Sequence, residues 1–100
     1  MAKYDIYSST HGSSGYLMDL QDGIVENLST RVVAPLVPID EIPNRMKILN
    51  PVICVAGTEC LLLTHLLAAI PVSTLKIKVG SAAAQRDEII ASLDLLFTGF

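Results

Sequence analysis

The apolar residues of this chain change their spacing once, after Gly80-Ser81, and this change restricts the fold more than any other feature. Before it, segment 3–7 alternates polar and apolar residues, a pattern typical of a strand, and segment 16–20 predicts a second strand that forms a hairpin with the first across a long loop. After it, apolar side chains follow the helical period and predict one buried helix face, made of Ile89, Ile90, Leu93, Leu96 and Phe97. Early strands followed by one terminal helix imply an antiparallel sheet packed by that helix, an α+β and mainly β fold.

Two further regions before that change predict strands. Segment 31–37 predicts a strand in which Pro35, which has no N–H to donate, marks an edge or a bend. Segments 51–55 and 60–63 flank the short polar stretch 56–59 and predict a hairpin.

The region between the hairpin and the terminal helix is the most ambiguous. The Leu- and Ala-rich run 61–70 favours a helix on propensity alone, and segment 72–79 predicts a strand. We expect the terminal helix to begin near Ala82 with Ser81 as its N-cap, and to end with Gly99 as its C′ residue.

Length and composition add an expectation about assembly. The chain has 100 residues, which predicts one domain spanning 1–100. Hydrophobic residues make up 51% of it, and charged residues make up only 17%, below the roughly 25% of an ordinary soluble domain. A small domain with surplus apolar residues often hides some of them between subunits, so we expect a homo-oligomer.

The charge balance argues against nucleic acid and membrane partners. The net charge is −3, and the seven Lys and Arg residues are scattered, so we expect no direct binding to nucleic acid. The longest apolar stretch, 61–72, contains His65 and Pro71 and falls short of the roughly 20 residues of a membrane span. Two cysteines and no signal peptide predict a cytoplasmic protein.

Residues that carry catalytic chemistry are few. His11 lies in a polar segment and His65 in an apolar run, where a solvated or hydrogen-bonded histidine is the ordinary interpretation. With a three-residue hairpin turn, Cys54 and Cys60 would lie directly opposite each other, and we interpret them as packed thiols. Neither cysteine belongs to a zinc-ligand pattern. We therefore expect no metal, no cofactor and no enzymatic activity.

An ordered series of short motifs points to a family. They are Asp19-Leu20-Gln21 with Ile24-Val25, Arg31-Val32-Val33-Ala34-Pro35-Leu36, Pro51-Val52, Ile70-Pro71-Val72-Ser73, and Arg86 and Ile89 followed by Leu93 through Phe100. Taken together, over essentially the whole chain, they resemble the CcdB toxin family, the gyrase poisons of plasmid and chromosomal toxin–antitoxin modules.

The resemblance implies a fold and a function. The family has an SH3-like, antiparallel five-stranded sheet with a smaller second sheet and one C-terminal α-helix, which would make 61–70 strand plus loop. It forms homodimers that insert between the A subunits of DNA gyrase and trap the cleaved DNA complex. A CcdA-like protein antitoxin wraps the dimer and prevents or reverses this poisoning.

The resemblance also implies which residues contact gyrase. The corresponding positions are Ile24, Val25, Asp94, Phe97, Thr98, Gly99 and Phe100. The best-known family tail has Trp at the position of Thr98 and Ile at that of Phe100, and Asp94 replaces an amide. Because Thr buries far less surface than Trp, these departures bear on the strength of gyrase binding.

Three alternatives stay open on the sequence. The first is an endoribonuclease of related fold, which would need a basic groove and an acid–base set. The second is a non-toxic or weakened homologue that serves as an antitoxin-binding decoy, an interpretation that Thr98 favours. The third concerns the tail alone: Leu96 and Phe97 would be core residues, and Phe100 would fold back onto the protein.

Overall fold

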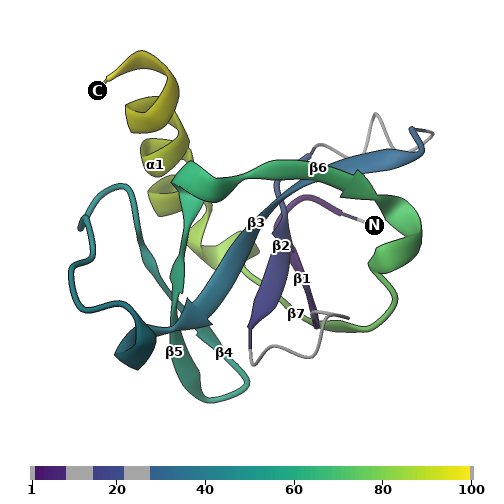
Figure 1. The fold of residues 1–100 in the computed structure, drawn as a ribbon, viewed down its shortest axis with the longest axis horizontal. Helices are drawn as coiled ribbons and strands as arrows, with labels where there is room; N and C mark the ends of the chain where they lie inside the picture. The colour runs from purple at the N-terminus through teal and green to yellow at the C-terminus, as the bar shows by residue number, and fades with distance from the viewer. Residues whose placement is uncertain (1, 9–14, 22–27, 100) are drawn as a thin grey trace.

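Strand β3 (Thr30–Pro38) is the longest strand, and the rest of the sheet is arranged around it (Figure 1). The computed structural model describes residues 2–8, 15–21 and 28–99. One edge of β3 pairs with β2 (Tyr16–Asp19), and the other pairs with β6 (Ala68–Pro71) and then with β5 (Thr58–Leu62). The sheet continues through β4 (Val52–Val55), β1 (Asp5–Ser8) and β7 (Lys78–Ser81), in the order β4-β5-β3-β2-β1-β7.

This sheet confirms the α+β class and corrects its details. All strand pairings are antiparallel, and one C-terminal helix follows the strands. The described residues form a single seven-stranded sheet, in place of a five-stranded sheet with a smaller second one. The reason is the nine-residue length of β3, which lets two short strands pair along one edge and keeps all strands hydrogen-bonded together.

Pro35 lies inside β3, and its place explains why a central strand tolerates it. Its partner on β2 is Leu17, and on the other edge its carbonyl accepts a hydrogen bond from the Leu63 N–H at 2.9 Å. On that edge β5 ends at Leu62, opposite Leu36, and β6 begins at Ala68, opposite Val33. The missing N–H therefore falls at a change of partner, where the ladder is already interrupted.

The β4–β5 hairpin turns at Ala56 and Gly57, whose φ values are 50° and 83°. Positive φ at both central residues is typical of tight two-residue hairpin turns. The register therefore pairs Cys54 with Glu59, and the prediction that Cys54 lies opposite Cys60 is wrong. The two thiols are separated further by burial, since Cys54 is exposed and Cys60 is buried.

The chain between β5 and the helix contains two corrections. The helix that propensity favours over 61–70 is wrong, because β5 runs to Leu62 and the 3-10 turn η3 (Thr64–Leu66) leads into β6. This is the strand and loop that the family resemblance implied. Pairing of β6 with β3 overrides local propensity here.

The strand predicted over 72–79 is also wrong over its first part. The 3-10 turn η4 (Val72–Thr74) occupies that part, and strand structure returns only at β7. The Thr74 hydroxyl donates to the Pro71 carbonyl at 2.7 Å, and the Leu75 N–H donates to the Val72 carbonyl at 3.1 Å. These local bonds close a turn in place of the ladder bonds of a strand.

The main core lies between the curled sheet and helix α1 (Arg86–Thr98). Its most deeply buried members are Ile6, Met18, Ala34, Leu36, Ile53, Cys60, Leu62 and Ile89. A smaller cluster contains Tyr7, Val33 and Leu75. Neighbouring residues of β3 enter different clusters because successive side chains of a strand point to opposite faces.

Helix α1 begins four residues later than predicted. The 3-10 turn η5 (Ala83–Gln85) precedes it, and Gln85 is the N-cap residue of α1, so the prediction of Ser81 as the N-cap is wrong. The Ser81 hydroxyl instead accepts from the Ala83 N–H at 3.2 Å, ahead of the helix. The predicted buried face is also partly wrong, because Ile90 is 42% exposed. Ile89 and Ser92 are the buried residues of the helix, and Ser92 was not expected there.

Candidate functional site

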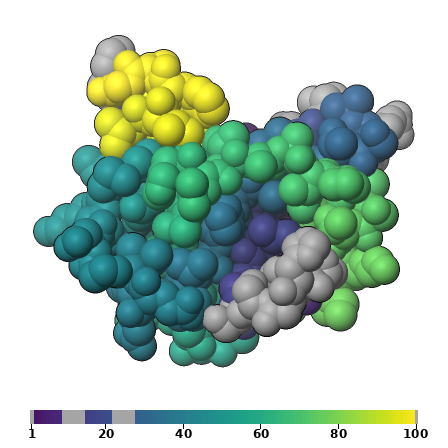
Figure 2. Space-filling model, in the orientation of Figure 1, coloured from purple at the N-terminus to yellow at the C-terminus, as the bar shows by residue number. Residues whose placement is uncertain are grey.

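The C-terminal end of α1 stands clear of the sheet and rises above the surrounding surface (Figures 1 and 2). Phe97 is 69% exposed, the largest exposure of any large hydrophobic residue in the described part of the chain. Asp94, Thr98 and Gly99 are exposed beside it. The interpretation of Phe97 as a core residue is therefore wrong, and an apolar side chain is presented on a projecting helix end.

Local hydrogen bonds define the shape of this end. Gly99 has φ 84°, and its N–H donates to the Leu95 carbonyl at 3.1 Å, so the helix ends there as predicted. The Thr98 hydroxyl donates to the Asp94 carbonyl at 2.6 Å. The backbone of the site is thus fixed by the helix itself, and the side chains of Asp94 and Phe97 are left on its surface.

The base of α1 is tied to the sheet by buried contacts. Ile89 is fully buried in the main core. The Ser92 hydroxyl donates to the Ile89 carbonyl at 2.8 Å and lies 3.1 Å from the Thr64 hydroxyl, in a buried contact. At the helix start, the Gln85 amide donates to the Val52 carbonyl at 2.8 Å. The projecting end therefore extends from a firmly held base.

A buried ion pair holds the chain on both sides of segment 22–27. Arg31 and Asp19 are fully buried, and two guanidinium nitrogens, Nε and Nη2, donate to Asp19 Oδ2 at 3.0 and 2.8 Å. Arg31 Nη2 also donates to the Gln21 carbonyl at 2.7 Å, and Gln21 Oε1 accepts from the Val32 N–H at 2.9 Å. The motif residues Asp19, Gln21 and Arg31 therefore have a structural role that the sequence did not reveal.

Three of the predicted gyrase-contact residues, Ile24, Val25 and Phe100, lie outside the described residues. The described chain that flanks 22–27, at the end of β2 and the start of β3, lies on the opposite side of the fold from the end of α1 (Figure 1). The structure therefore brings Asp94, Phe97, Thr98 and Gly99 together and leaves the other three predicted residues unplaced.

Catalytic groups are not gathered near this end. The described residues hold no cluster of three or more His, Cys, Asp or Glu side chains that would bind a metal ion. His65 is exposed, and its Nδ1 lies 3.3 Å from the Asn50 amide nitrogen. Burial, followed by the neighbouring Cys54 and Glu41, raises the pKa of the Cys60 thiol, which keeps it protonated and unreactive.

A curled antiparallel sheet with one C-terminal helix, whose apolar end is exposed, defines a small α+β protein with a candidate protein-binding surface. A family model described as CcdB protein matches residues 3–99, and the chain belongs to the CcdB family. This is a family of toxins from toxin–antitoxin systems, and membership implies poisoning of DNA gyrase. No curated protein matches the chain.

Within residues 2–8, 15–21 and 28–99, no helix combines the length and the apolar character that crossing a bilayer requires.

Proposed function

We propose that this protein is the toxin of a type II toxin–antitoxin system and acts in the cytoplasm as one domain spanning 1–100. It binds the A subunit of DNA gyrase and traps the gyrase–DNA cleavage complex, which blocks replication and transcription. Membership of the CcdB family supports this proposal. The single observation that supports a particular surface for this contact is the exposure of Phe97 on the projecting end of α1.

The proposed gyrase contacts are Ile24, Val25, Asp94, Phe97, Thr98, Gly99 and Phe100. Phe97 supplies the apolar anchor, because aromatic residues carry a large share of binding energy at protein interfaces. Asp94 lies one turn before it and offers a charge. Thr98 adds little apolar surface, and its hydroxyl is bonded within its own helix. The contact is therefore expected to be weaker than one anchored by Trp.

A homodimer is part of the proposal. Besides Phe97, the exposed large hydrophobic residues include Ile90 on α1 and Leu66 on η3, the turn that contacts α1. A two-fold dimer would bury these apolar side chains. It would also allow Ile24 and Val25 of one chain and the α1 end of the other chain to contact gyrase together. Mass by sedimentation tests this assembly.

The antitoxin is proposed to act through a disordered segment. The toxin has a net charge of −3, so gross charge does not favour an acidic partner. A segment that orders as it wraps the dimer explains binding through buried apolar surface.

The mechanism is tested with purified gyrase, supercoiled DNA and this protein. Cleaved DNA is expected to accumulate only when all three are present, since the proposed toxin has no hydrolytic activity and does not bind DNA by itself. Cleavage of RNA by the purified protein alone would instead favour the endoribonuclease.

A weakened homologue that acts as an antitoxin decoy is the second candidate, and the small, internally bonded Thr98 favours it. Expression in a gyrase-sensitive host, with and without the antitoxin, separates the two. Growth arrest that the antitoxin relieves supports the toxin. Antitoxin binding without growth arrest supports the decoy.

A further inference from the structure

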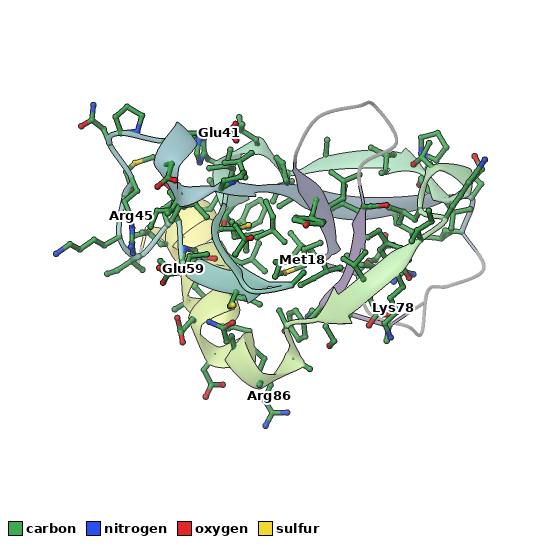
Figure 3. The ribbon with its side chains drawn as sticks, turned by 90° about the horizontal axis from the view of Figure 1, so that it is seen from below. Met18, Glu41, Arg45, Glu59, Lys78 and Arg86 are labelled. Carbon is green, nitrogen blue, oxygen red and sulfur yellow. The ribbon has the colours of Figure 1, made fainter. Side chains whose placement is uncertain are left out.

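A cavity of about 300 Å³ lies beside the N-terminal half of α1, away from the projecting end. One wall is the loop that carries Arg45, Lys47 and Ile48, and the other is the helix flank formed by Glu88 and Ala91. Pro51 and Val52 form the remaining lining. Figure 3 shows Arg45 on this loop, on the side of the molecule away from Lys78.

Both walls of the cavity are held in place by hydrogen bonds. Asn50 is buried, its Oδ1 accepts from the Met46 N–H at 3.1 Å, and its amide donates to the Leu62 carbonyl at 3.2 Å. This fixes the loop on β5. The Gln85 amide fixes the start of α1 on β4 through the Val52 carbonyl. The cavity is therefore formed before any partner binds, which lowers the entropic cost of binding.

The lining combines positive charge with apolar surface. Arg45 and Lys47 face one acidic residue, Glu88, and Ile48 is 63% exposed. Arg45 is poorly satisfied: its Nη2 donates to the Lys47 carbonyl at 3.3 Å, and its Nε is buried with no partner among the described residues. A carboxylate is the natural partner for a guanidinium with donors to spare.

We propose that this cavity binds a short peptide segment that carries acidic and aliphatic residues, presented by a partner protein. The carboxylate would pair with Arg45 and Lys47, and an aliphatic side chain would cover Ile48 and Val52. A volume of about 300 Å³ is at the lower end for ligand sites, which suits one or two anchoring side chains. This site lies outside the proposed gyrase contact and goes beyond that function.

The test is a nitrogen–proton correlation NMR titration of the full chain with the peptide acetyl-Leu-Glu-Leu-Glu-Leu-amide. We expect saturable shifts confined to residues 45–48, Val52 and the Glu88–Ala91 turn, with a dissociation constant on the order of 0.1 mM. The matched peptide with Gln in place of Glu is expected to bind at least about fivefold more weakly.

Substitutions locate the contact. Arg45→Gln is expected to weaken binding of the acidic peptide about five- to tenfold, whereas Lys76→Gln, at an exposed lysine outside the cavity, leaves it unchanged. Glu88→Gln removes the opposing charge and is expected to strengthen binding about two- to fivefold, while its neighbour Asp87→Asn has little effect.

Three results would overturn the proposal. They are absence of shifts at millimolar peptide, equal binding of the Glu and Gln peptides, and binding of free isovalerate as tight as that of the peptide, which would indicate a small-molecule site. The titration contains no gyrase. Its failure therefore leaves the proposed toxin activity untouched, and failure of gyrase poisoning leaves the peptide site untouched.

Discussion

At the scale of single residues, the Asp19–Arg31 pair is the salt bridge of the described structure that is buried on both sides. Both side chains are fully buried, and Arg31 also reaches the Gln21 carbonyl. Breaking one half of a buried pair leaves an unpaired charge in a medium that solvates it poorly. Asp19 and Arg31 belong to two of the motifs that resemble the family, but the sequence did not predict their contact. The two residues are twelve positions apart and meet because β2 pairs with β3.

Asp19→Ala is expected to lower the free energy of unfolding by about 3–5 kcal/mol, measured by urea denaturation. The matched control is Lys78→Met, which removes the ion pair with Asp5 at 3.2 Å, where the lysine side chain is 54% exposed. That change is expected to cost less than about 1 kcal/mol. Equal losses in the two variants would contradict the structural role of the buried pair.

The two cysteines are expected to differ in reactivity. Cys54 is exposed and should react rapidly with a thiol reagent in the native protein at pH 8. Cys60 is buried, and burial raises its pKa, so it should react only after unfolding. Because the folded form holds this proton more tightly, the stability that Cys60 contributes is present at neutral pH and is lost as pH rises past its ordinary value of 9.0. Rapid modification of two thiols would contradict this arrangement.

At the scale of elements, helix α1 has an N-terminal part that is packed on the sheet through Ile89 and Ser92, and a C-terminal end that is exposed at Phe97. The sequence predicted the helix and its end at Gly99, because helical periodicity and a C′ glycine are local signals. It misplaced the buried face, because Ser92 is buried through Thr64, which is 28 residues away and adjacent only in the fold. For the same reason, local propensity wrongly favoured a helix over 61–70, where pairing with β3 stabilises a strand, and only the family resemblance implied strand plus loop.

The candidate site was predictable to a similar extent. Helical periodicity placed Phe97 on the buried face, whereas the family resemblance named it as a contact residue, and its ring is exposed in the structure. That the end of α1 projects, and that the flanks of 22–27 lie across the fold from it, depends on tertiary packing (Figure 1). Local patterns carry no information of that kind.

Alanine substitutions in the two halves of α1 are expected to have different effects, on stability in the first half and on growth inhibition in the second. Ile89→Ala should lower the free energy of unfolding by about 2–5 kcal/mol, because Ile89 is fully buried in the core. Phe97→Ala should change it by less than about 0.5 kcal/mol, yet reduce growth inhibition, because the ring is on the surface. Thermal melts and growth assays run side by side check both. A strongly destabilised Phe97→Ala would show that the helix end is structural.

At the scale of the whole molecule, apolar side chains that a single chain leaves exposed near α1 are expected to be buried in a homodimer. Besides Phe97, which is proposed to contact gyrase, Ile90 and Leu66 are exposed apolar residues at or near α1. Sedimentation equilibrium at micromolar concentration is expected to give about twice 10.7 kDa. A monomer under those conditions would contradict the proposed dimer.

Antitoxin binding is expected to show the signature of coupled folding. Calorimetry of the toxin with the product of the adjacent antitoxin gene should give a large negative heat-capacity change, since an ordering segment buries apolar surface. Binding with no heat-capacity change would point instead to a preformed partner and rigid docking.

The central claim is that the end of α1 contacts gyrase, and a truncation ending at Phe97 tests it most directly. Removing Thr98, Gly99 and Phe100 deletes the helix-terminal bonds from the Thr98 hydroxyl and the Gly99 N–H to α1, and terminal residues carry few fold contacts, so the melting temperature should stay close to that of the full chain. The same truncation removes three of the proposed contact residues and is expected to reduce accumulation of gyrase-cleaved DNA strongly. A truncation that is folded and still traps cleaved DNA as well as the full chain would contradict the account.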